Sequence, residues 1–434
     1  MTPTYWAIGV LVLGALVVLL LVAQLSAHPR MVAYTGLPFA VVAAGLGWQV
    51  GSPVALAVVA LCGVCIVALL LIPVLEPAVP QHTAEAAALL LLGTAGAVAL
   101  AQATDLLQTV VGLETLALSA VTLVALGAGE RSIEAAFKYI VLGAISLASL
   151  LYGLGLVYLG SGSLAFPTAQ LMAANPLILA GVVLVGLGIA FELALVPLHW
   201  GALDAYTAAA PGLAGFVMSA SKLAAAFALG RVVLAAGGSL AQILVWVGCI
   251  TIVWGTFGAL AQAGDLRRML AYSAITHAGF IGLALGSGPN GPTTAGFYAA
   301  AYASMAMVVF AGLAGPSAID LRTIGPVRAL AVGLGLFSLA GIPPTPGFWA
   351  KLAVLVVAWQ YAGWLPTLIA VAGGVFSVLY YLRPIPDLFA ALRGGPEVAV
   401  EPRPVLVPGI VVATLAVLVM SLSPGVAWYL VQRG

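Results

Sequence analysis

Charged residues are scarce in this chain. Only 6% of its 434 residues are Asp, Glu, Lys or Arg, whereas about a quarter of the residues of a soluble domain are charged. The formal net charge is +1 and no run of basic residues is present, so the composition gives no basis for binding nucleic acid. Because 63% of the residues are hydrophobic, lipid is the expected solvent of most of the chain.

Cysteine is almost absent as well. Two of the three cysteines form Cys62-x-x-Cys65 inside an apolar run, and the third is Cys249. We interpret all three as small core residues, because the pair lies in an expected membrane helix and not in a redox loop. No cysteine ligand cluster and no glycine-rich nucleotide loop of an α/β unit occurs. We therefore expect no redox cofactor and no metal in this chain.

Long apolar runs follow one another almost without interruption. A run of about 20 apolar residues spans a bilayer, and the first run, from Trp6 to Leu25, has neither the basic start nor the small-residue cleavage site of a signal peptide. The expected fold class is an all-α polytopic membrane protein with about 14 transmembrane helices. The expected spans are 5–25, 31–50, 53–75, 84–103, 106–127, 134–160, 177–201, 210–235, 239–262, 266–287, 293–315, 327–361, 364–392 and 404–431.

The arginines test the count of spans, because short cytoplasmic loops collect Lys and Arg. Only Arg231 and Arg433 fall outside the odd-numbered loops. An even number of spans with cytoplasmic odd loops places both termini on the outer side. The arginines in or beside odd-numbered loops are Arg30, Arg131, Arg267, Arg268, Arg322, Arg328, Arg383, Arg393 and Arg403.

Two expected spans carry proline where a helix should continue. The span 177–201 contains Pro197, and the span 327–361 contains Gly341-Ile342-Pro343-Pro344-Thr345-Pro346-Gly347. Proline removes a backbone donor and breaks a helix. Interruptions five spans apart indicate two inverted five-helix repeats, although an ordinary proline kink is the simpler alternative. The predicted units are 1–80 (three helices), 81–236 (first repeat, spans 4 to 8), 237–395 (second repeat, spans 9 to 13) and 396–434 (last helix).

Lysines are the first candidates for function. A charge at the bilayer centre costs about 2.5–3.5 kcal/mol or more, so such residues face the bundle interior and are functional candidates. The chain has three lysines: Lys222 in the middle of the eighth span, Lys351 just after the twelfth-span interruption, and Lys138 near the start of the sixth. At Lys138 a structural side chain that reaches to the membrane surface is the alternative.

Acids and histidines add three further candidates. Glu114 lies in the fifth span, Glu192 precedes the interruption of the seventh, and His277 is near the centre of the tenth. We expect both glutamates to be buried. For His277, a hydrogen bond that bridges helices is an equal alternative.

These residues fit a proton relay. Burial disfavours the charged form of a side chain, and a nearby opposite charge favours it. A buried lysine, glutamate or histidine held between these influences can release and regain a proton. The alternative is that each group pairs with a neighbouring side chain, transfers no proton and only holds helices together. The predicted relay, bridged by water, comprises Glu114, Glu192, Lys222, His277 and Lys351.

Several motifs resemble the antiporter-like membrane subunits of respiratory complex I (NADH:quinone oxidoreductase) and their relatives in multisubunit cation/proton antiporters. The resemblance covers roughly residues 80–395. Its motifs are Asp105-Leu106-Leu107 with Gly112-Leu113-Glu114, the run Glu134 to Ala144, Arg267-Arg268-Met269-Leu270-Ala271-Tyr272-Ser273-Ala274-Ile275-Thr276-His277, Leu339 to Lys351, and Tyr380-Tyr381-Leu382-Arg383.

The resemblance is nearest to subunit N, because of the sequence from Lys138 to Gly143, a lysine at 351 and the lack of a long lateral helix. It implies fourteen helices, both termini outside, and proton-carrying roles for Glu114, Lys222 and Lys351. It also implies other membrane subunits as partners, with FMN, iron–sulfur clusters and quinone held by partner subunits. A bacterial or archaeal inner (plasma) membrane is the expected location.

The seventh span departs from the family pattern. The family usually has a lysine where this chain has Glu192, and the motif that follows is incomplete: His199, Asp204 and Tyr206 fit, but Leu203 stands in place of a proline. The glutamate pair that results can share a proton, because like charges at one site favour protonation of one of them. Alternatively, the first half-channel is inactive and only the route from Lys222 to Lys351 conducts.

The expected function is proton translocation driven by redox chemistry in partner subunits of a complex I type enzyme. Two alternatives keep the fold: a subunit of a multisubunit cation/proton antiporter or membrane-bound hydrogenase, and a structural membrane subunit without transport. The Glu192 departure favours the structural alternative, whereas Lys222, His277 and Lys351 oppose it.

Overall fold

The computed structural model describes residues 3–25, 29–49, 53–72, 82–127, 129–315, 320–393, 406–422 and 425. These residues form helices joined by turns, with one isolated β-bridge between Asp105 and Ala165. Arg403, Arg433 and the last part of the expected span 404–431 lie outside the described residues, as does the Arg30 side chain.

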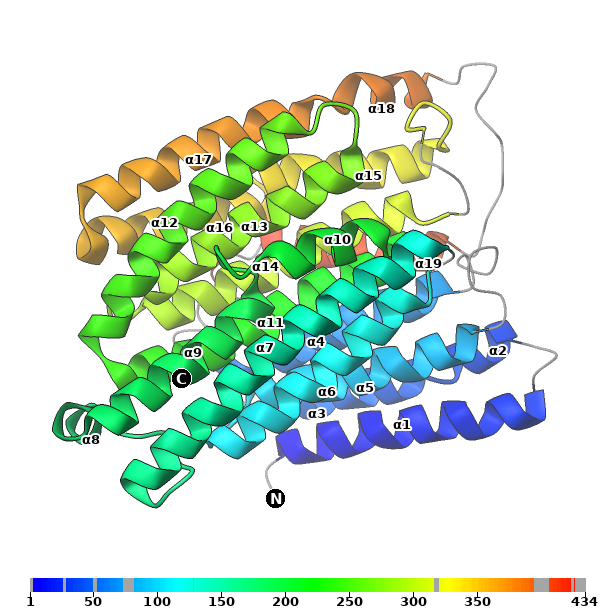
Figure 1. Ribbon diagram of the computed structural model, residues 1–434. Helices are drawn as coiled ribbons and strands as arrows, with labels where there is room; N and C mark the ends of the chain where they lie inside the picture. Colours follow the sequence, from blue (N-terminus) through cyan, green and yellow to red (C-terminus); the bar gives the residue numbers. More distant parts are fainter. Residues whose placement is uncertain are drawn as a thin grey trace.

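The helices run in alternating directions and form a bundle (Figure 1). The first four are α1 (Pro3–Leu25), α2 (Pro29–Tyr34), α3 (Leu37–Trp48) and α4 (Pro53–Leu71). The middle of the chain forms α5 (Thr83–Ala101), α6 (Leu106–Ala125), α7 (Glu130–Ser161), α8 (Ala169–Ala174), α9 (Pro176–Leu193), α10 (Trp200–Ala208) and α11 (Pro211–Ala236). The remainder forms α12 (Gly238–Ala261), α13 (Leu266–Leu285), α14 (Gly291–Leu313), α15 (Pro326–Ala340), α16 (Pro346–Val357), the π-helical turn η2 (Ala358–Ala362), α17 (Trp364–Leu382), α18 (Ile385–Leu392) and α19 (Val407–Leu422).

Nine stretches of helix among the described residues are long and apolar enough to cross a membrane, and four shorter apolar helices accompany them. A polytopic helical membrane protein is therefore confirmed. Besides the two spans with predicted interruptions, two further expected spans are divided: 31–50 into α2 and α3, and 364–392 into α17 and α18. The divisions fall at Gly36-Leu37-Pro38 and at Pro384-Ile385-Pro386, where proline lacks the N–H that a continuous helix needs.

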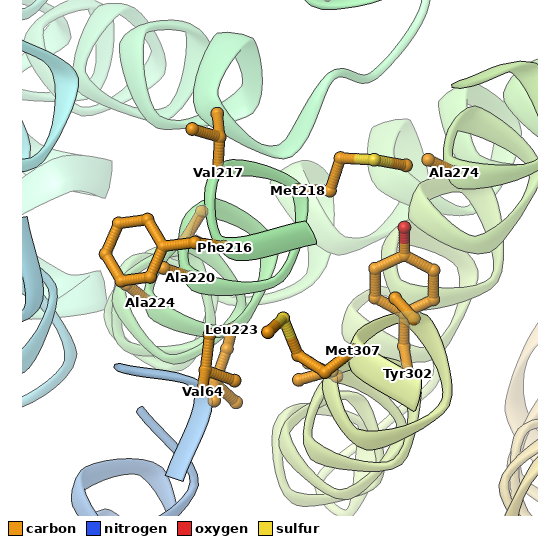
Figure 2. Packing of buried hydrophobic residues seen from close by; sticks show 14 of the residues in the cluster. Val64, Phe216, Val217, Met218, Ala220, Leu223, Ala224, Ala274, Tyr302 and Met307 are labelled. Carbon is orange, nitrogen blue, oxygen red and sulfur yellow. The ribbon is translucent and has the colours of Figure 1, made fainter. Parts of the chain in front are cut away.

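Helices α11 and α14 form the centre of the bundle. Nearly all residues of α11 and α14 are buried, whereas most residues of α7 are not. Figure 2 shows how α11 fills this position: Leu223 lies beside Val64 of α4, while Met218 points toward Ala274 of α13. A helix that is apolar all round is expected in such a core.

Small residues bring α12 and α13 into close contact. A Cβ added at Gly248 would lie 2.4 Å from the backbone nitrogen of Leu283, and one added at Gly279 would lie 2.6 Å from that of Ile252. Glycine lets helix backbones approach closely in membranes, where packing replaces the hydrophobic effect as the source of association. This contact fixes the position of α13 at Gly279, two residues after His277.

Both interruptions predicted from proline are present. Helix α9 is followed by Ala194, whose φ is 62°, and α15 is followed by Gly341, whose φ is 84°. The chain then continues through Pro197 into α10 and through Pro343 and Pro344 into α16. Both ends therefore use a left-handed residue to leave the helix, and backbone groups near each interruption need other partners.

Candidate proton-relay site

Glu192 lies in the last turn of α9, directly before the first interruption. Its side chain is buried, and Oε1 accepts a very short hydrogen bond from the Ser221 hydroxyl of α11. Oε2 has no hydrogen-bond partner among the described residues. A buried carboxyl oxygen without a partner is costly. Glu192 is therefore an incompletely satisfied group, as expected of a site that exchanges protons or water.

Glu114 reaches the same region from α6. It lines a pocket of about 110 Å³ together with Glu192 and Tyr139, between α6, α7 and α9. Contrary to the expectation of full burial, Glu114 is only half-buried, because α6 lies toward the outside of the bundle and half of its most apolar window is not buried. The two carboxyl groups thus face one pocket, and Glu114 is the one nearer to the protein surface.

Lys222 lies in the middle of α11 and is completely buried. Its ammonium group donates a hydrogen bond of 3.1 Å to the Tyr206 hydroxyl of α10, and lies 4.7 Å from the centre of the Tyr206 ring. It also lies 5.8 Å from the centre of the Tyr302 ring of α14. Aromatic faces attract cations, most strongly where water is excluded. No described carboxylate forms an ion pair with Lys222, so aromatic rings and one hydroxyl are its nearest polar partners.

His277 uses both ring nitrogens. Nδ1 lies 2.7 Å from the Tyr298 hydroxyl of α14, and Nε2 lies 3.0 Å from the Tyr381 hydroxyl of α17. The Tyr381 hydroxyl donates its own proton to Ser273 at 2.6 Å, so its oxygen accepts from Nε2. One neutral tautomer satisfies all three bonds, with Nε2 as donor and Nδ1 as acceptor.

Lys351 is held at the second interruption. Its ammonium group donates to the Leu339 carbonyl at 3.0 Å, the Ala340 carbonyl at 2.8 Å and the Ser377 hydroxyl at 3.0 Å. Ser377 donates its own proton to the Gly374 carbonyl, which leaves its oxygen free to accept. A protonated lysine has three N–H donors. The three oxygens therefore satisfy the charged form completely, and two of them come from the end of α15.

Two polar residues lie apart from these contacts. Lys138 is about half exposed and forms ion pairs of 2.7 Å with Glu134 and 3.2 Å with Asp204. It is thus part of a network at one end of α7, and no hydrogen bond joins it to the buried residues above. His199 is buried at the start of α10 between the rings of Trp200 and Trp254, with centroid distances of 4.7 and 5.8 Å.

Tyrosines and serines are the residues that sequence reasoning missed. Tyr206 and Tyr381 appeared there only as parts of motifs, although each binds a candidate relay residue directly. Tyr298 and Tyr302 lie four residues apart on α14, a spacing that places two side chains on one helix face. Two tyrosines at this spacing in an otherwise apolar helix were the available signal.

The described residues contain no group of three or more His, Cys, Asp and Glu side chains suited to hold a metal ion. Cys62, Cys65 and Cys249 are all free and buried, as predicted for small core residues. The polar groups of the site are instead single side chains on different helices, connected through hydroxyl groups.

Apolar helices, two of them ending at interruptions, form a bundle that encloses hydrogen-bonded lysine, histidine and carboxyl groups, which defines a polytopic helical membrane protein with polar groups in its core. The family described as NADH:quinone oxidoreductase/Mrp antiporter, transmembrane, matches residues 103–377. The chain belongs to this family and is an antiporter-like membrane subunit of the complex I type.

The relatives are named NADH-quinone oxidoreductase subunit N. The chain is 34% identical to that of Deinococcus radiodurans, over 80% of this chain and 74% of the relative. It is also 34% identical to that of Cereibacter sphaeroides, over 87% of both chains. These matches confirm the resemblance inferred from the motifs.

Solved structures show the same fold. A chain of respiratory complex I from Thermus thermophilus superposes with a TM-score of 0.78 at 27% identity, covering 97% of this chain and 98% of that chain. A chain of the membrane-bound sulfane sulfur reductase, an archaeal respiratory complex, gives 0.85 at 24% identity, covering 100% and 97%. A chain of the Mrp complex from a Dietzia species gives 0.80 at 20% identity, covering 99% and 96%. The last two likenesses concern the fold alone.

Proposed function

We propose that the chain is a proton-translocating membrane subunit of a complex I type NADH:quinone oxidoreductase, with redox chemistry in partner subunits as the driving force. Lys222 and Lys351 are buried, and no carboxylate of the described residues forms an ion pair with either of them; this observation carries the proposal. A permanently buried charge with no counter-ion is expensive, so a lysine kept in such a place is expected to change its protonation state. Family membership supports the same function.

The proposed path starts at the pocket shared by Glu114 and Glu192. Glu192 contacts Ser221, the residue before Lys222 on α11, which connects the carboxyl pair with the central lysine. From the centre, the path continues through His277 to Lys351. Ser377 and Tyr381 support this step, because they lie one helical turn apart on α17 and bind Lys351 and His277 respectively. A protonated and a deprotonated carboxyl group can alternate in the Glu114 and Glu192 pair without a lysine in α9.

The proposed topology has fourteen spans, both termini outside, and the units 1–80, 81–236, 237–395 and 396–434, with 81–236 and 237–395 as inverted repeats. Two helix caps support the inversion. Asp105 caps α6 by accepting from the Gln108 N–H, and Asp265 caps α13 by accepting from the Arg268 N–H. Each cap starts the second helix of its repeat.

The caps lie at opposite ends of α7, which is 32 residues long and hence about 48 Å. The Leu106 N–H, beside the first cap, bonds to the Leu164 carbonyl just after the end of α7. Arg268, beside the second cap, approaches Asp204 to 3.9 Å, and Asp204 pairs with Lys138 near the start of α7. Equivalent caps on opposite membrane faces are what inverted repeats require.

The proposed location is a bacterial or archaeal inner membrane, with other membrane subunits as partners and FMN, iron–sulfur clusters and quinone outside this chain. An assembly in a cation/proton antiporter or a membrane-bound hydrogenase is the second candidate, favoured by the family description, which also includes Mrp antiporters. Subunits that co-purify with the chain discriminate between these assemblies.

Replacement of the buried lysines tests the proposal. In the assembled complex, Lys222→Ala and Lys351→Ala are each expected to lower the number of protons translocated per electron, because each removes the buried lysine of its repeat. Proton uptake by vesicles during NADH oxidation measures the ratio. Arg393→Ala, which removes an exposed cation, serves as the control. Normal ratios in both lysine variants would refute the relay.

A further inference from the structure

Two hydrogen-bonded groups face each other across the centre of the bundle without a direct bond. Lys222 and Tyr206 form the first, and His277 forms the second with Tyr298 and Tyr381. No hydrogen bond of the described residues connects the two groups. A proton that passes from Lys222 to His277 therefore needs a further polar group between them.

Tyr302 occupies this place. The centre of its ring lies 5.8 Å from the Lys222 ammonium group and 5.0 Å from the centre of the His277 ring. Its side chain is buried, and it lies one turn from Tyr298 on α14. Tyr302 thus contacts both groups, although neither of them binds its hydroxyl.

The Tyr302 hydroxyl has no hydrogen-bond partner among the described residues. Figure 2 shows it pointing toward the side chains of Met218 and Ala274, away from Met307. Met218 is one turn from Lys222 on α11, and Ala274 is one turn from His277 on α13. The hydroxyl therefore points toward the region where the helices that carry Lys222 and His277 meet.

A buried hydroxyl without a partner is destabilising, and such groups in native proteins are usually bound by water. Methionine is unbranched and flexible, so Met218 can move aside for a water molecule at little cost. A water at this position would reach the Tyr302 hydroxyl from the side on which both helices present their relay residues.

We propose that the Tyr302 hydroxyl is the proton-carrying link between the Lys222 group and the His277 group. This inference rests on the proposed function. A proton leaves the Lys222 ammonium group and reaches the Tyr302 oxygen through water. The hydroxyl proton of Tyr302 then passes, also through water, to the Tyr298 oxygen, while the proton of Tyr298 moves to His277 Nδ1. The hydroxyl of each tyrosine is neutral before and after the step, and no electron is transferred.

Tyr302→Phe tests the link, because phenylalanine keeps the ring between Lys222 and His277 and removes only the hydroxyl. In the assembled complex we expect proton translocation to fall to about a tenth or less, since a positioned proton-transfer group contributes roughly 10²–10⁴-fold. The control is Thr256→Val on α12, which also removes a buried hydroxyl without a hydrogen-bond partner among the described residues and has no place in the proposed path. We expect this variant to translocate protons normally.

The outcomes separate this inference from the function on which it rests. Normal translocation in Tyr302→Phe together with impaired Lys222→Ala would overturn the role of Tyr302 and leave the relay intact. Normal translocation in all these variants would overturn both. If Tyr302→Phe does not assemble, Tyr302→Gln and Tyr302→Met take its place, because they are similar in length and only Gln is polar. Equal translocation by these two would refute the link.

Discussion

The second interruption requires a glycine, and the substitution Gly341→Ala should show how much stability this glycine contributes. Gly341 has a φ of 84°, and a left-handed conformation costs a residue with a Cβ about 1–2 kcal/mol. Alanine recovers about 0.4–1 kcal/mol of this by restricting the unfolded chain, so the backbone alone should be destabilised by about 1 kcal/mol.

Crowding adds to this backbone effect. The new Cβ would lie 3.0 Å from Cδ of Lys351 and 3.4 Å from its Nζ, so the lysine stem must shift by a few tenths of an ångström. The shift would weaken its hydrogen bonds to the Leu339 and Ala340 carbonyls, each worth about 1.5–3 kcal/mol for a charged group. We therefore expect a total loss of roughly 1–3 kcal/mol, together with slower proton translocation.

Thermal unfolding of the purified protein in detergent measures the stability. Gly374→Ala is the matched control, because a Cβ at this position of α17 meets nothing within 4 Å and alanine favours a helix by about 1 kcal/mol. The first interruption offers the reverse exchange. Ala194 has a φ of 62°, so Ala194→Gly should be neutral or stabilising. A melting temperature of Gly341→Ala at or above that of the parent would show that the reasoning is wrong.

Two further substitutions test the packing and the helix caps. Gly279→Ala should lower the melting temperature and impair proton translocation, because its Cβ would lie 2.6 Å from the Ile252 nitrogen and would separate α12 from α13 beside His277; a normal melting temperature would contradict the close contact. Asp105→Ala should destabilise the protein by about 1 kcal/mol through loss of the cap on α6, whereas Asp105→Asn, which keeps an acceptor for the Gln108 N–H, should melt close to the parent.

Much of the fold could be predicted from the sequence, because spans and interruptions depend on local composition. Apolar runs bounded by polar turns marked the helices, and proline marked the ends of α9 and α15. The scarcity of charge also identified Lys222 and Lys351 as candidates, because a charged side chain within an apolar membrane helix can rarely reach water.

The partners of these residues could not be predicted. His277 bonds to Tyr298 and Tyr381, which follow it by 21 and 104 residues. The composition of the three helices does not show which of their faces pack against one another. An amphipathic pattern would show which face of a helix is buried, but nearly all residues of α14 are buried. The pairing of Lys138 with Asp204 and the half-burial of Glu114 depend on the same tertiary arrangement.

The two central lysines differ in the hydrogen-bond partners that the helix interruptions provide. The second interruption frees the Leu339 and Ala340 carbonyls, and Lys351 takes both, so that one side chain satisfies the end of α15 while its three donors are satisfied in return. At the first interruption the Val196 N–H instead bonds to Thr251 of α12, and Lys222 has one hydroxyl and two aromatic faces. Lys351 thus has protein partners for all three N–H groups, whereas Lys222 needs water for the remaining two. A water molecule beside Tyr302 could accept these two hydrogen bonds. We therefore expect hydration to control proton transfer at the centre of the bundle and not at the second interruption.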